Sequence, residues 1–133
     1  MLYLITNSEI KASYCDFQYE QIKNEPNVFW LNTFIPTTKT SGLTEEGEPI
    51  TIPNTYFLTY AEKVDSLRFK RQWLLDKTDC GVVQDSPLDE ERLVELKAWR
   101  TDLRNFTQFV TEGNIDTYLL PAPPAWAVGW FKL

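Results

Sequence analysis

Short runs of hydrophobic residues separated by polar turns fill the first 60 residues of the chain. The runs at residues 2–6, 28–35, 48–52 and 55–60 are rich in the β-branched and aromatic residues that strands favour. Asn, Ser, Gly and Pro, which favour turns, lie between them. The pattern predicts a small, twisted antiparallel β-sheet domain over residues 1–60.

The pattern changes near residue 61, where the chain becomes charged, rich in Leu and nearly free of Gly. Val64, Leu67, Leu74 and Leu75 share one face at helical spacing, so a first helix is expected over residues 61–77.

A second helix is expected over residues 86–110. Ser86 suits the N-cap, Pro87 the first helical position, and Asp89 completes a capping-box-like pattern. A hydrophobic seam follows at spacings of three and four residues, which is typical of a helix that packs on another helix. Its members are Leu96, Trp99, Leu103, Phe106 and Val110. Residues 61–112 are therefore interpreted as a helical hairpin.

The last segment, residues 113–133, combines prolines with aromatic residues. Pro121, Pro123 and Pro124 argue against a helix and favour an extended conformation, and Trp126, Trp130 and Phe131 are spaced as on an extended strand. Such a tail either folds back on its own sheet or adds to a partner, and the sequence leaves both open. The fold class expected for the whole chain is α+β.

Composition narrows the function. The 133 residues include five Trp, six Tyr and eight Phe, which form either an aromatic core or an exposed partner surface. A formal net charge of −6 argues against nucleic acid as a partner. No run of residues is long and apolar enough for a signal peptide or a membrane span, so a cytosolic protein is expected.

The residue types also limit the chemistry. The chain has no His, which removes the usual general base near neutral pH, and its two cysteines form no CxxC pair. Cys15 and Cys80 are interpreted as reduced, partly buried side chains, and no metal or cofactor is expected.

The acidic stretch at residues 78–91 raises the question of a carboxylate site. A calcium loop counted from Asp79 fails, because its third and fifth positions are Gly81 and Val83. The stretch is interpreted as the connector between the two helices, with Gly81 in a left-handed or close-packed position. Asp79 and Asp85 either bind turn amides or contact a partner.

Arg100 and Arg104 lie one helical turn apart beside the seam. They form either an interface pair that grips a partner's carboxylates or carbonyls, or an exposed pair balanced by nearby acidic residues.

Residues 71–106 contain an ordered set of residues: Arg71, Leu74, Leu75, Thr78, Asp79, Asp85, Pro87, Leu88, Trp99, Arg100, Leu103 and Arg104. Their order and approximate spacing resemble the phage tail-fibre assembly chaperone families. The recurring pattern of those families is an Arg, a Leu pair, Thr-Asp-Trp, Asp-x-Pro-Leu, and later Trp-x-x-Tyr-Arg-x-x-Leu-Arg. Cys80 stands where the family usually has Trp, and Ala98-Trp99-Arg100 compresses the Trp/Tyr-Arg segment.

The resemblance implies a non-enzymatic protein that holds the distal, β-rich end of a phage tail-fibre protein while its three chains trimerise. It would act in the host cytoplasm during assembly and either leave or stay on the fibre of the virion. Strand addition by residues 118–131 is one expected binding mode. The residues proposed to contact the partner are Trp99, Arg100, Arg104, Asp79, Asp85, Trp126, Trp130 and Phe131.

Three other functions remain open at this stage. A permanent tail, baseplate or fibre-tip component of the virion would use the same surfaces. A small enzyme working through carboxylates and an inhibitor of a host protein are the remaining classes.

Overall fold

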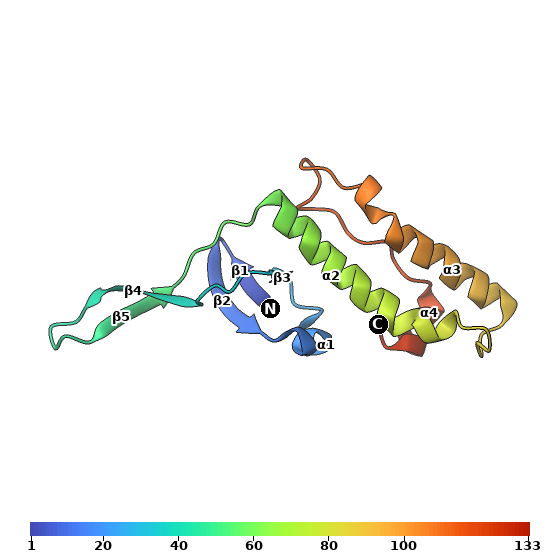
Figure 1. Ribbon diagram of the computed structural model, residues 1–133, viewed down its shortest axis with the longest axis horizontal. Coiled ribbons are helices and arrows are strands. Elements are labelled where there is room, and N and C mark those ends of the chain that lie inside the picture. Colours follow the sequence, from blue (N-terminus) through green and yellow to red (C-terminus); the bar gives the residue numbers. More distant parts are fainter. The chain divides into compact units, whose positions relative to one another are not determined.

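The computed structural model describes all residues, 1–133, and has mixed α+β architecture, as expected from the sequence (Figure 1). It divides into two compact units, Met1–Ser66 (unit 1) and Leu67–Leu133 (unit 2).

A three-stranded antiparallel sheet forms the first part of unit 1. Its strands β1 (Leu2–Thr6), β2 (Glu9–Tyr14) and β3 (Val28–Trp30) lie in the order β2-β1-β3. Asn7 and Ser8 both have positive φ, the geometry that two-residue hairpin turns favour. The strand at residues 2–6 is confirmed. The strand expected over residues 28–35 is shorter than predicted, because pairing with β1 stops at Trp30.

Tyr3 is the centre of the core of unit 1. Its side chain is fully buried, and its hydroxyl donates to Thr33 O at 3.3 Å and accepts from Ile35 N at 3.0 Å. The buried phenol therefore fixes the irregular chain after β3. The other buried members of this core are Ile5, Ile10, Leu31 and Ile35.

A second, two-stranded sheet follows. Its strands β4 (Thr38–Leu43) and β5 (Pro49–Pro53) form an antiparallel hairpin (Figure 1). Every residue in both strands is exposed. The strand predicted at residues 48–52 is confirmed as β5. The strand predicted at residues 55–60 is wrong, because only Thr55 makes a bridge, to Glu9, and helix α2 begins at Tyr60.

Two short turns of helix connect β2 to β3. The 3₁₀ turn η1 (Asp16–Gln18) leads into α1 (Tyr19–Ile22), which buries Tyr19.

Helix α2 (Tyr60–Thr78) confirms the helix predicted over residues 61–77. Thr59 starts it with a capping box, because Glu62 N donates to Thr59 Oγ1 at 3.2 Å and Thr59 N donates to Glu62 Oε1 at 3.1 Å. After α2, the 3₁₀ turn η2 (Asp79–Gly81) opens the connector.

Helix α3 (Glu90–Arg104) begins later than predicted. Its N-cap is Asp89, whose side chain accepts a hydrogen bond from Arg92 N at 2.8 Å, so the expected cap at Ser86 is wrong. Ser86 instead donates its hydroxyl to Gly81 O at 2.7 Å inside the connector. The 3₁₀ turn η3 (Phe106–Gln108) replaces the expected last helical turns. The seam itself is confirmed, since all five members are buried: Leu96, Trp99, Leu103, Phe106 and Val110.

The C-terminal segment differs most from expectation. Trp126, Trp130 and Phe131 lie on helix α4 (Ala125–Phe131), not on an extended strand. The prolines stop at Pro124, which occupies the N-cap and therefore costs the helix no hydrogen bond. The tail packs on the helices of unit 2. The core there consists of Leu75, Leu88, Leu96, Trp99, Leu103, Ala127 and Phe131.

The two cysteines are free but exposed, so the expectation that they are partly buried is wrong.

The packing around Gly81 in unit 2 leaves no room for a side chain. A Cβ at Gly81 would lie 2.6 Å from Leu96 Cδ2 and 2.7 Å from Phe131 Cζ, whereas one at Gly129 on α4 would meet nothing within 4 Å. Gly81→Ala should lower the free energy of unfolding by about 1–3 kcal/mol through overpacking. Gly129→Ala should raise it by about 0.5–1 kcal/mol, because Ala is the better helix former. Urea unfolding followed by circular dichroism measures both, and equal effects of the two substitutions would refute the close packing.

Tyrosine ionisation provides a test of the packing in unit 1. Burial raises the pKa of Tyr19 to about 12, and a hydrogen bond to Glu62, followed by burial, raises the pKa of Tyr56 to about 12. Their contribution to stability is fully present below pH 10, the pKa of an unfolded tyrosine, and is lost as pH rises towards 12. When tyrosinate absorbance is followed as the pH is raised, part of the increase should occur near pH 12 instead of pH 10. The free energy of unfolding should fall between pH 10 and 12, and Tyr19→Phe should make this fall smaller. A single transition near pH 10 for all tyrosines would contradict this packing.

Candidate functional site

The guanidinium of Arg100 is buried and contacts Thr78 and Asp79, two other residues of the pattern found in the sequence. Arg100 is only 4% exposed. Its Nη1 donates to Leu75 O at 2.7 Å and to Thr78 Oγ1 at 2.6 Å, and its Nη2 donates to Asp79 Oδ1 at 2.6 Å. Arg100 therefore joins the last turn of α2 to the middle of α3.

The chemistry of a helix end explains this arrangement. The last four carbonyl groups of a helix have no partner within it, and a cation near them is favoured by the helix dipole. Leu75 and Thr78 belong to the final turn of α2, and the Thr78 hydroxyl also donates to Leu74 O at 2.9 Å. Asp79, whose side chain is 61% exposed, supplies the counter-charge at the solvent edge.

Trp99 connects α3 to the proline-rich segment. It is 4% exposed, and its indole Nε1 donates to Pro121 O at 2.8 Å. As a buried side chain it stabilises unit 2 and presents no surface to a partner.

The aromatic residues of α4 form a cluster around Arg92. The Arg92 guanidinium lies 5.3 Å from the ring centroid of Trp126 and 5.7 Å from that of Trp130. Trp126 also donates its indole N–H to Glu95 Oε2 at 3.2 Å. Phe131 is 7% exposed and belongs to the core, whereas Trp130 is 49% exposed and offers an aromatic surface.

Asp85 is separate from this cluster. It is exposed in the connector, and no hydrogen bond or ion pair of its side chain occurs in the structure. The eight predicted contact residues thus divide into buried ones (Trp99, Arg100 and Phe131), partly buried Trp126, and exposed ones (Asp79, Asp85, Arg104 and Trp130).

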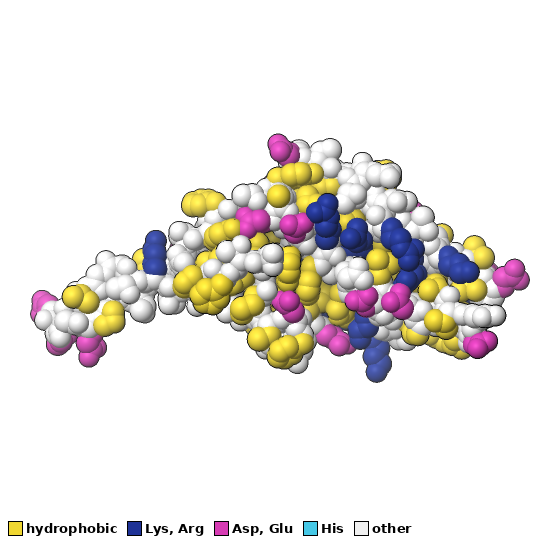
Figure 2. Space-filling view, in the orientation of Figure 1, with side chains coloured by type: hydrophobic (Ala, Val, Ile, Leu, Met, Phe, Trp, Pro, Cys, Tyr) yellow, Lys and Arg dark blue, Asp and Glu magenta, His cyan; other side chains and the backbone are white.

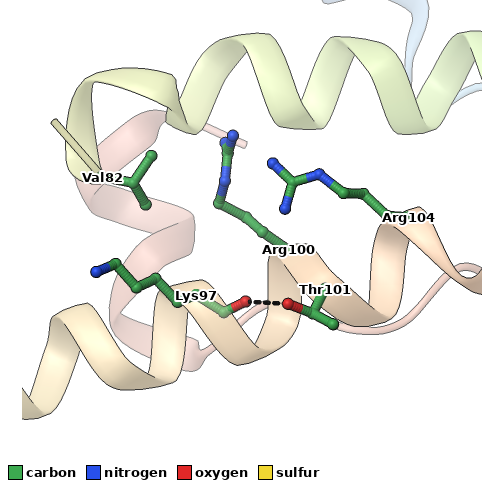
Figure 3. A pocket seen from close by; sticks show the side chains of 5 residues that line it. All are labelled: Val82, Lys97, Arg100, Thr101 and Arg104. Carbon is green, nitrogen blue, oxygen red and sulfur yellow. Dashed lines mark hydrogen bonds between the residues drawn. The ribbon is translucent and has the colours of Figure 1, made fainter.

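Arg104 and Arg100 share an open pocket of about 330 Å³ (Figure 3). The other lining residues are Val82, Lys97 and Thr101. Lys and Arg side chains gather over the α2 and α3 region in Figure 2. Sequence reasoning missed Lys97 and Val82, although the spacing of Lys97, Arg100 and Arg104 places three cations along one side of a helix.

Other kinds of site find less support. No group of three or more Cys, Asp or Glu side chains is placed to hold a metal ion. None of the helices combines the length and the apolar character that crossing a membrane requires.

Comparison with known proteins gives no relative. No protein-family model, curated protein or solved structure matches the chain.

The role of Arg100 can be tested by substitution. Arg100→Met should lower the free energy of unfolding by about 1–3 kcal/mol for each buried oxygen that loses its donor. Arg104→Met, at an exposed position four residues along the same helix, should change it by less than about 0.5 kcal/mol. Urea unfolding measures both values. Equal stability of Arg100→Met and the unmodified chain would show that the hydrogen bonds of Arg100 to the end of α2 do not stabilise the fold.

Proposed function

We propose that this chain is an assembly chaperone for a phage tail fibre, which binds the distal, β-rich end of the fibre protein and promotes its folding and trimerisation. The observation that carries the proposal is the contact among the residues that resemble the chaperone families. Thr78 and Asp79 lie about twenty residues before Arg100 in the family pattern, yet both accept hydrogen bonds from its guanidinium. Residues that define the family pattern in the sequence are thus in contact in the folded chain.

The hydrophobic positions of the same pattern support this reading. Leu75, Leu88, Trp99 and Leu103 belong to one core. The departure from the pattern at Cys80 falls on an exposed side chain, so it leaves the contacts of Thr78 and Asp79 with Arg100 intact.

The β4–β5 hairpin is the best surface for the fibre. An isolated two-stranded hairpin is marginally stable in water, and its unpaired edges are templates for another strand. Leu43 is 67% exposed, and Ile50 and Ile52 are 41% and 37% exposed. The hairpin thus offers both backbone groups and apolar side chains to a β-rich partner.

This surface replaces the binding mode expected from the sequence. Strand addition by residues 118–131 requires an extended tail, but α4 is helical and buries Ala127 and Phe131.

Co-expression with the fibre protein encoded beside this gene tests the function. Soluble, trimeric fibre is expected only when this chain is present, as judged by size-exclusion chromatography with mass measurement. Fibre that trimerises equally well alone would refute the chaperone role. In that case, stoichiometric amounts of this chain in purified virions would identify a permanent component.

The hairpin can be tested in the same assay. Leu43→Asp should reduce the yield of trimeric fibre about tenfold or more, because it places a charge in an apolar interface. Val94→Asp is the matched control, since Val94 on α3 is 62% exposed, and it should leave the yield unchanged. Both variants should unfold within about 0.5 kcal/mol of the unmodified chain, as surface substitutions usually do. Equal yields from the two variants would exclude the hairpin as the contact surface.

A further inference from the structure

The pocket on α3 is basic in an acidic protein. The chain has 13 Lys and Arg against 19 Asp and Glu, yet three of the five lining residues are cations and none is acidic. Charges of one sign gathered at a concave site attract a ligand of the opposite sign.

Two of these cations are available to a ligand. Arg100 is paired with Asp79, whereas Lys97 and Arg104 are exposed and have no acidic partner in the structure. The acidic residues of the chain therefore do not already neutralise the pocket.

The geometry of the pocket favours a planar anion. Figure 3 shows the Arg104 side chain directed back along α3, so that its guanidinium faces the guanidinium of Arg100. Asp79 already pairs with Arg100, so the charge left for an anion to neutralise is that of Arg104 together with Lys97. Arg100 is held by three hydrogen bonds, so one side of the site is already ordered before a ligand arrives.

We propose that this pocket binds a carboxylate group presented by an acidic segment of a partner protein. The guanidinium fork of Arg104 matches the two oxygens of a carboxylate, and Lys97 adds a second positive charge in the same pocket. Val82 provides an apolar wall for the methylene groups of an acidic side chain. A nucleic acid would need a longer basic surface than one pocket, and the net charge of −6 would repel it.

This site does not depend on the partner being a tail fibre. It remains if the chaperone role fails, and the chaperone role remains if the pocket binds nothing.

The test uses fluorescein-labelled hexaglutamate and, as the uncharged probe, labelled hexaglutamine, with binding to the full chain followed by fluorescence anisotropy. Hexaglutamate should bind and hexaglutamine should not. Lys97→Gln and Arg104→Gln should each weaken binding about fivefold to tenfold, the loss of one charge-assisted hydrogen bond. Lys39→Gln on β4 is the matched control, because it makes the same change in net charge at an exposed site and should alter binding less than about twofold.

Two results would overturn the proposal. Equal weakening by Lys39→Gln and Arg104→Gln would show general attraction to the chain with no specific site. Unlabelled glutarate, a small dicarboxylate, and inorganic phosphate can each be titrated against bound hexaglutamate. If phosphate displaces the peptide at about a tenth of the concentration that glutarate requires, the pocket is a phosphate site. Unfolding curves of all three variants should match that of the unmodified chain, because the substituted side chains are exposed.

Discussion

The organisation of unit 2 depends on one buried guanidinium. Arg100 reaches from the middle of α3 to the last turn of α2, where it supplies donors to a backbone carbonyl, a threonine hydroxyl and a carboxylate. A guanidinium is always charged, so a buried one without hydrogen-bond acceptors and a counter-charge would be costly. The acceptors of Arg100 lie at the end of α2 and at the start of the connector. Both segments must therefore be correctly placed relative to α3 for the guanidinium to be paired. A shift of α3 by one residue would move Arg100 away from all three acceptors.

The same arrangement separates the residues that build the fold from those that can meet a partner. Trp99 and Arg100, which the sequence singles out as candidate contact residues, are buried and contact other parts of unit 2. Surfaces suited to a partner lie elsewhere, at the exposed hairpin, at Trp130 and at the basic pocket. Residues that stand out in a sequence can thus serve the fold, while other residues form the surfaces that a partner can reach.

The helical spacing of hydrophobic residues, sustained over several turns, is the most informative pattern in the sequence. It predicted α2 almost to its ends and all five buried seam residues, because helical spacing leaves a clear signal over several turns. Strand β4 was missed, since Thr38 to Leu43 contain few hydrophobic residues and bury none of them. β4 forms because it pairs with β5, and such a contact between strands is not encoded in local β-propensity.

The helix at the C-terminus and the burial of Arg100 do not follow from the sequence, for different reasons. Three prolines suggested an extended tail through Phe131, but their effect ends at the first helical turn, after which Ala127 and Phe131 lie one turn apart and reach the core. The burial of Arg100 could not be inferred from the sequence, because a charged residue on a helix is usually solvated and only the end of α2 supplies its acceptors.

The prolines of β5 determine which side of the hairpin can be extended. Asn54 N donates to Thr37 O on the β4 side, so the N–H groups of Ile50 and Ile52 point towards β4, and positions 49, 51 and 53 point away from it. Two of those three outward positions are Pro49 and Pro53, which have no N–H to donate. The outer edge of β5 is therefore nearly closed to a new strand, as in proteins that protect a sheet edge with proline. The outer edge of β4 has no proline, so any strand that lengthens this sheet must align beside β4, and the order of the resulting three strands is fixed before a partner arrives.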